Sequence, residues 1–164
     1  MAVRLRWRGV FILAAALVLF SACASATASH PLTGTTATAG PVTVTTNLAS
    51  YTTGEAIGVV VTNSSKTGYY TQDGKSACTI VQLELFDTKT GAWKPVDLCN
   101  NGQATQTFLL AESSSVPYTL APTSTSDLNT WQSGTYRVSV TYSTQADGVT
   151  NPQTAHSAAF VIKG

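Results

Sequence analysis

Apolar and polar residues alternate along most of the chain beyond residue 41, with the period of two that is typical of half-buried β-strands. The clearest run is 135–142, where every second residue is Tyr or Val. No stretch keeps a helical period over three turns. The pattern predicts seven or eight short strands separated by turn residues, over 42–46, 56–62, 78–86, 93–99, 106–110, 115–120, 135–142 and 155–163.

Strands of this number and spacing typically form an antiparallel sandwich or a barrel, so one all-β domain is expected over 41–164. Pro117 suits an edge strand, because proline cannot donate a hydrogen bond to a β-ladder. Residues 50–55 are predicted to form a turn between two strands. The polar segment 63–75 is predicted to be a long loop.

An apolar run near the N-terminus breaks the strand pattern. Three arginines within the first eight residues precede the uncharged segment 10–20, and small residues follow at positions 21 and 22. These are the three parts of a secretory signal, and the apolar run is too short to cross a bilayer, which takes about 20 residues. We therefore predict a signal peptide over 1–22; the alternative is an N-terminal membrane anchor that is not cleaved.

Cys23 follows the two small residues in the stretch Leu19-Phe20-Ser21-Ala22-Cys23, which resembles a bacterial lipobox although Phe20 replaces the usual leucine. In a lipobox the cysteine is lipidated and becomes the new N-terminus. Residues 23–40 are small and polar, and cannot bury enough apolar surface to offset their ordering entropy. We predict a lipid-anchored flexible linker over 23–40; the alternative is plain secretion after cleavage at a later small residue.

Charged residues make up only 10% of the chain, against an average near 25%. Beyond Cys23 there are six basic and eight acidic side chains, which gives a net charge near −2. A nucleic-acid-binding protein needs a clustered basic surface, so the composition argues against this class of partner. Thr and Ser dominate the composition, which also argues against a coiled coil.

Cys78 and Cys99 remain as an even pair if Cys23 is lipidated or leaves with the signal, and an exported protein meets an oxidising compartment. Residues 87–91 are predicted to be the turn of a hairpin, with Gly91 suited to a positive φ. A hairpin folded there brings both sulfur atoms to its open end on one face. We predict a Cys78–Cys99 disulfide; the alternatives are two free thiols or a metal-binding pair.

No catalytic or cofactor-binding motif stands out, and no cofactor is expected. The two histidines, His30 and His156, lie in no triad-like or nucleophile-elbow motif, and phosphate-binding glycine motifs and calcium loops are missing from the sequence. Glu55, Glu84 and Glu112 are interpreted as solvated side chains. A glycosidase pair of carboxylates remains an alternative, because its members can be distant in sequence.

Four aromatic side chains form the candidate binding surface. Phe86 and Trp93 share the outward face of the predicted hairpin and should be near neighbours close to its tip, whereas Tyr69 and Tyr70 lie in the longest predicted loop. Exposed aromatics in the loops of a sandwich often mark a recognition surface. The alternative is structural, with Trp93 folded over the sheet edge and a tyrosine covering the end of the core. Trp131 is predicted to be a core residue.

The chain contains, in order, the motifs Ser50-Tyr51-x-x-Gly54-Glu55-x-Ile57, Val59-Val-Val-Thr-Asn63-Ser64-Ser65, Leu83-Glu84-Leu85, Trp93-x-Pro95-Val96, Leu120-Ala-Pro122-Thr-Ser124 and Gly134-Thr-Tyr136-Arg137-Val138. This order resembles the small extracytoplasmic immunoglobulin-like domains of bacterial lipoproteins, although Thr123 replaces the glycine that is common after Leu-x-Pro. The motif Gly134-x-Tyr136 also resembles a tyrosine corner, in which the phenol hydroxyl bonds back to the chain. The resemblance implies an immunoglobulin-like antiparallel sandwich, distantly similar to bacterial proteinase inhibitors, and a non-enzymatic role; no functional residue carries over.

Together these features predict an exported, lipid-anchored binding or spacer module at the bacterial cell envelope, and not an enzyme. Its expected partners are the membrane, through the N-terminal lipid, and an envelope protein or glycan. One alternative is a secreted protease inhibitor that acts through an exposed loop, either 63–75 or the 87–91 hairpin. A second alternative is a small hydrolase whose carboxylates converge in a pocket.

Overall fold

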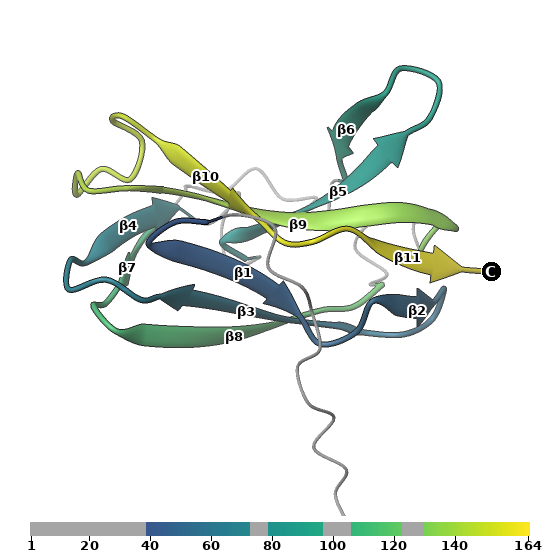
Figure 1. The fold of residues 1–164 in the computed structure, drawn as a ribbon, viewed down its shortest axis with the longest axis horizontal. Helices are drawn as coiled ribbons and strands as arrows, with labels where there is room; N and C mark the ends of the chain where they lie inside the picture. Colours follow the sequence, from purple (N-terminus) through teal and green to yellow (C-terminus); the bar gives the residue numbers. More distant parts are fainter. Residues whose placement is uncertain (1–38, 73–78, 97–105, 123–129) are drawn as a thin grey trace, which may run out of the picture.

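The alternating segments form two β-sheets that pack against each other, in a computed structural model that describes residues 39–72, 79–96, 106–122 and 130–164 (Figure 1). The smaller sheet consists of β1 (Val42–Thr46), β3 (Ile57–Asn63) and β8 (Ser114–Leu120), in the order β1-β3-β8. The larger sheet consists of β2 (Ser50–Thr52), β4 (Tyr69–Gln72), β5 (Val81–Asp87), β6 (Ala92–Pro95), β7 (Thr107–Leu110), β9 (Gly134–Ser143), β10 (Gln153–His156) and β11 (Phe160–Lys163). The predicted all-β sandwich is therefore confirmed for the part of the chain that the structure describes.

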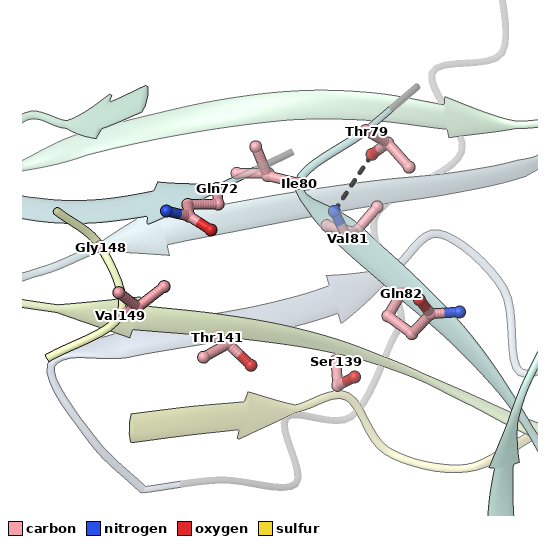
Figure 2. A pocket seen from close by; sticks show the side chains of 9 residues that line it. All are labelled: Gln72, Thr79, Ile80, Val81, Gln82, Ser139, Thr141, Gly148 and Val149. Atoms are coloured by element: carbon pink, nitrogen blue, oxygen red, sulfur yellow. Dashed lines mark hydrogen bonds between the residues drawn. The ribbon is translucent and has the colours of Figure 1, made fainter. Parts of the chain in front are cut away.

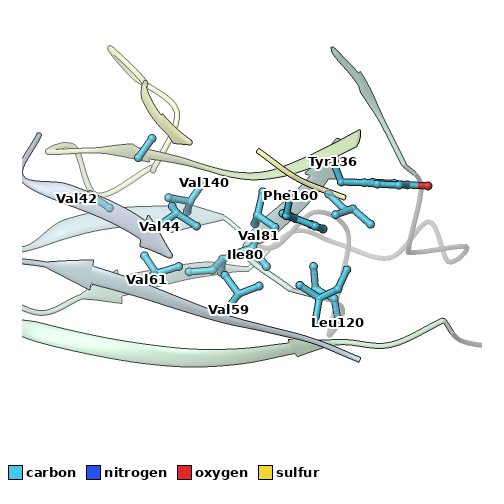
Figure 3. Packing of buried hydrophobic residues seen from close by; sticks show 14 of the residues in the cluster. Val42, Val44, Val59, Val61, Ile80, Val81, Leu120, Tyr136, Val140 and Phe160 are labelled. Atoms are coloured by element: carbon cyan, nitrogen blue, oxygen red, sulfur yellow. The ribbon is translucent and has the colours of Figure 1, made fainter. Parts of the chain in front are cut away.

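The core lies between the two sheets and is built from the alternating residues of their strands (Figure 3). In β3 the predicted inward residues Ile57, Val59 and Val61 are almost completely buried, and the even-numbered residues from Tyr136 to Tyr142 fill the same role in β9. Full burial of one such aliphatic side chain is worth about 1.5–3 kcal/mol relative to exposure. The period of two thus places one face of each sheet in the core and leaves the other face available for polar residues.

β9 is the central strand of the larger sheet and has neighbours along both edges. On one edge it pairs with β10 and β11, and on the other with β4 and β5. β5 pairs with β9 only as far as Leu85, whereas its pairing with β6 continues to Asp87. The β5–β6 hairpin therefore projects from the sandwich (Figure 1).

Two aromatic side chains fix the entry into β9. The Tyr136 hydroxyl donates to the Gln132 carbonyl at 2.8 Å, which confirms the predicted tyrosine-corner bond. Burial raises the pKa of the Tyr136 phenol, so it stays neutral and able to donate this bond. Trp131 is only 2% exposed and its Nε1 donates to the Glu55 carbonyl at 2.8 Å, which confirms the prediction that it is a core residue.

The end of β3 is tied to its surroundings by the buried amide of Asn63. Its Nδ2 donates to the carbonyls of Thr67, Leu110 and Ala111 at 2.8–3.1 Å, and its Oδ1 accepts bonds from the backbone N–H and hydroxyl of Ser65. Leu110 belongs to the larger sheet and Asn63 to the smaller one. One side chain therefore links the two sheets at this end of the sandwich.

The described residues form eleven strands, so the prediction of seven or eight strands was wrong in three places. The predicted turn 50–55 contains β2, which pairs in parallel with β11. The predicted loop 63–75 contains β4, which pairs with β9 and β7. The predicted last strand is divided into β10 and β11, because residues 158 and 159 lie in no strand. Ser157, just before them, still bonds to Val138: its N–H donates to the Val138 carbonyl and its hydroxyl accepts from the Val138 N–H. Pro117 lies in β8, an edge strand of the smaller sheet, as predicted.

Candidate functional site

The outer face of the larger sheet carries an ionic cluster that crosses three strands. Glu84 of β5 lies opposite Arg137 of β9, and the two side chains form an ion pair through Nε and Oε2. The Ser139 hydroxyl donates to the other carboxylate oxygen at 3.3 Å, and Nδ1 of His156 in β10 lies 3.9 Å from Oε2. The Glu84 and Arg137 side chains are only 17% and 22% exposed. The interpretation of Glu84 as a solvated side chain was therefore wrong.

An aromatic pair adjoins this cluster close to the turn of the β5–β6 hairpin. Phe86 and Trp93 are cross-strand partners, with ring centroids 5.1 Å apart and planes tilted by 56°. The Arg137 guanidinium carbon lies 4.5 Å from the Trp93 ring centroid, which is a cation–π distance. The predicted proximity of Phe86 and Trp93 is confirmed. We refer to Glu84, Phe86, Trp93 and Arg137 as the cation–aromatic cluster.

The hairpin turn beyond the cluster is held by Asp87, the last residue of β5. Asp87 accepts hydrogen bonds from the N–H groups of Lys89 and Gly91 at 2.9 and 2.8 Å, and its carboxylate lies 2.5 Å from Lys94 Nζ. The Lys94 hydrogen bond, supported by the Lys89 N–H, lowers the pKa of Asp87 to about 2. Gly91 has a φ of 68°, which confirms the predicted turn and the need for glycine there. The hairpin tip is thus exposed and internally bonded.

Tyr69 and Tyr70 do not join the cation–aromatic cluster. Tyr69 is 8% exposed and packs edge-on against Tyr142, with ring centroids 5.1 Å apart, so it is a core residue. Tyr70 points to the opposite side of β4 and is half-buried. It pairs with Ser143 of β9, whereas Glu84 of the cluster pairs with Arg137 of the same strand. Six strand residues separate these two positions, which corresponds to roughly 20 Å. Of the four candidate aromatics, the structure brings together Phe86 and Trp93.

A groove of about 200 Å³ lies on the same outer face, between β5, β9 and the loop that joins β9 to β10 (Figure 2). Ser139 and Thr141 of β9 and Gln82 of β5 contribute side chains to it. Gln72 and Val149 line the opposite part of the groove. Ser139 belongs both to this groove and to the ionic cluster, so the two features adjoin on one surface.

His156 is the last residue of β10 and is half-buried. Burial lowers the pKa of its imidazole, and the positive charge of Arg137 acts in the same direction, against a smaller opposing effect of Glu84. The imidazole is therefore neutral at pH 7 and adds no charge to the Glu84–Arg137 pair.

The three glutamates singled out from the sequence lie in different parts of the described fold. Glu55 precedes β3 and accepts a bond from the Thr52 N–H, Glu112 is exposed in the turn between β7 and β8, and Glu84 is paired with Arg137. Among the described residues, no group of three or more His, Cys, Asp or Glu side chains is placed to bind a metal ion. Nor do these residues form a helix with the length and hydropathy of a membrane span.

The cysteine predictions fall on other parts of the chain. Cys23, Cys78 and Cys99 lie outside the described residues, as do the predicted signal peptide and nearly all of the predicted linker. The observed pairing of β5 with β6 ends at Glu84 and Pro95. No described strand pair therefore tests the register from which the Cys78–Cys99 disulfide is predicted. Lipidation and the Cys78–Cys99 disulfide therefore stay predictions.

The sequence reasoning missed the partners of Glu84. Arg137, Ser139 and His156 belong to strands far from Glu84 in the sequence, and no pattern within one strand reveals its neighbour in the sheet. The scarcity of charged residues was a usable signal, because a chain with 10% charge that places Glu84 and Arg137 on outward strand positions favours pairing between them. No protein family model matches the chain, and no curated protein is found to be similar to it.

Proposed function

We propose that the chain is exported, anchored to the bacterial cell envelope by a lipid on Cys23, and acts there as a non-enzymatic binding module of immunoglobulin-like type. The leader, the lipobox-like stretch and the polar linker support the location. The cation–aromatic cluster supports a binding role and is the observation on which the proposal depends. Its expected partner is an envelope protein or glycan.

The chemistry of this cluster suits recognition. Trp and Arg are enriched among the residues that contribute most to binding energy, because both offer a large contact area together with hydrogen-bond donors. Here the Glu84 ion pair and the Phe86 ring restrict the side chains of Arg137 and Trp93 before any ligand arrives. Less side-chain entropy is then lost on binding, which favours affinity.

The location and the binding role are tested in two successive experiments. Cys23→Ser should move the protein from the membrane fraction to the soluble fraction; retention in the membrane would contradict lipid anchoring. The soluble variant is then titrated against isolated envelopes of a host that exports it. In the Cys23→Ser protein, Trp93→Ala should raise the Kd for envelopes, measured by co-sedimentation, at least tenfold. This corresponds to a loss of about 1.4 kcal/mol of binding free energy. Val161→Ala, which changes an exposed apolar residue on the same sheet, is the control and should have no effect. Equal binding by both variants would refute the cluster as the recognition surface.

A second candidate is supported by the hairpin tip. A protease inhibitor of the loop type needs a projecting segment that keeps its shape, and Thr88, Lys89 and Thr90 are exposed on a turn fixed by Asp87. Lys89 would then occupy the specificity pocket of a protease that cleaves after basic residues. The test is inhibition of trypsin, which should disappear in Lys89→Ala; no inhibition by the unaltered protein would exclude this candidate.

A further inference from the structure

The groove beside the cation–aromatic cluster has the chemistry of a sugar site. We propose that it binds one ring of a neutral, polyhydroxylated ligand, such as a sugar unit of an envelope glycan. The inference rests on the proposed binding role and gives that role a ligand class. The groove has a volume of about 200 Å³, below the roughly 300–1,000 Å³ of pockets for drug-sized ligands. This size suits a single sugar ring or one unit of a longer glycan.

The polar side chains of the groove offer both hydrogen-bond acceptors and donors. Gln72 Nε2 donates to the Asp147 carbonyl at 2.7 Å, and Gln82 Nε2 donates to the carbonyls of Leu83 and Val96 at 3.0 and 2.8 Å. The Ser139 hydroxyl donates to Glu84. One N–H of Gln72 and the Ser139 hydroxyl are therefore engaged, and the oxygen atoms of both amides and of Ser139 can accept further bonds. The hydroxyl groups of Thr79 and Thr141 also line the groove and can donate as well as accept. Hydroxyl groups on a ligand suit this lining, because each of them can also do both.

The charge of the groove favours a neutral ligand. All nine lining residues are uncharged, and the adjoining carboxylate of Glu84 is paired with Arg137. An anion would meet several acceptor oxygens and no cation, whereas an ammonium group would find no free carboxylate. Neutral hydroxyl groups fit this environment because each can donate to an amide oxygen without a charge to compensate.

An exposed apolar side chain completes the site. Val149 lines the groove beside the amides and is 54% exposed, whereas the lining residues Ile80 and Val81 are 7% and 3% exposed and belong to the core. A pyranose ring has the same division into polar edges and apolar C–H faces. The rim is held in place, because Asp147 accepts bonds from the N–H groups of Val149 and Thr150 at 2.9 Å and Gly148 has a φ of 71°.

The groove also lies within reach of the cluster. Ser139 lines the groove, and Arg137 stands two residues earlier on the same face of β9, which corresponds to about 7 Å. A glycan of several units could therefore place one ring in the groove and another against Trp93. The groove and the cluster would then bind neighbouring units of the same glycan, so the groove adds a ligand class to the proposed binding role.

The experiment follows the backbone resonances of the isotopically labelled Cys23→Ser protein during titration with maltotriose, cellotriose and the trimer of N-acetylglucosamine. At least one trisaccharide should shift the amides of Gln82, Ser139 and Thr141, while inorganic phosphate and ethanolamine should not. Thr141→Tyr fills the groove from an exposed strand position and should weaken binding at least about tenfold. Thr154→Tyr is the matched control, because Thr154 is the cross-strand partner of Thr141 on the same face but does not line the groove.

The outcomes separate this inference from the proposed function. If no trisaccharide shifts the groove resonances, or if Thr141→Tyr binds as well as Thr154→Tyr, the sugar site is refuted. Trp93-dependent envelope binding would in that case leave the proposed function intact. If a trisaccharide binds in the groove but the soluble protein does not bind envelopes, the sugar site holds and the proposed function fails.

Discussion

Removal of the Asn63 side chain tests how the two sheets are held together. Asn63 is completely buried and its amide makes five hydrogen bonds, including bonds to the carbonyls of Leu110 and Ala111. In Asn63→Ala the alanine methyl offers none of them. Water can reach the carbonyls of the exposed residues Thr67 and Ala111, whereas Leu110 is 2% exposed and its carbonyl bond is the buried one.

The expected cost follows from this division. A buried polar group left without a partner costs about 1–3 kcal/mol, and each further lost bond about 1 kcal/mol or less where water replaces it. We therefore expect Asn63→Ala to lower the free energy of unfolding by about 3 kcal/mol. For a domain of this size that corresponds to a decrease in melting temperature of roughly 10 °C.

Urea and thermal denaturation, followed by circular dichroism, measure this effect. Ser65→Ala removes one of the five bonds, together with two exposed bonds between the Ser65 hydroxyl and the backbone of Thr67, and should cost about 1 kcal/mol because water can replace the exposed ones. Gln153→Ala removes an exposed amide and should stay within about 0.5 kcal/mol of the unaltered protein. A loss for Asn63→Ala no larger than that for Gln153→Ala would refute the view that a satisfied amide ties the sheets together.

Three further predictions concern the hairpin and the cysteines. Gly91→Ala should destabilise the domain by about 1 kcal/mol, because a residue with a side chain is strained at a φ of 68°. Gly54→Ala is the control and should be neutral, because the added Cβ would meet open space and Gly54 has no positive φ; thermal melts of both variants measure the difference. Asp87 has a folded-state pKa near 2, below its ordinary value of 3.8, so its stabilising contribution is present above about pH 4 and is lost as the pH falls through 2. Denaturation at pH 6 and pH 2.5 should therefore show a smaller acid-induced loss in Asp87→Asn than in the unaltered protein, and equal losses would contradict the shift. Mass measurement of the mature protein with and without reductant should differ by about 2 Da if Cys78 and Cys99 form a disulfide, and equal masses would remove that bond.

The strands that the sequence predicted best are those whose alternation is long. β3 and β9 have seven and ten residues, so the period of two is unmistakable and the buried face follows directly. β4 has four residues inside a polar segment, and so short a run has no recognisable period. β2 has three residues and exists because β11 offers a parallel edge, which is a property of the folded chain and not of the segment itself.

The candidate site shows the same limit more clearly. The hairpin turn is encoded locally by Asp87 and Gly91, so the neighbourhood of Phe86 and Trp93 could be predicted from the sequence. The position of Arg137 over Trp93 could not, because it depends on which strand lies next to β5 and in which register. The groove is harder still to foresee, since its residues come from β4, from the start of β5, from β9 and from the loop that follows β9.

The contrast between the two described indoles gives the protein a pair of optical probes. Trp131 is enclosed in the core, so its emission should be blue-shifted and shielded from iodide or acrylamide until the domain unfolds. Trp93 lies half-exposed beside a guanidinium group, so its emission should respond to anything that settles on the outer face. One fluorescence spectrum can thus report folding and ligand occupancy as separate signals, and Trp93→Phe or Trp131→Phe would assign each of them.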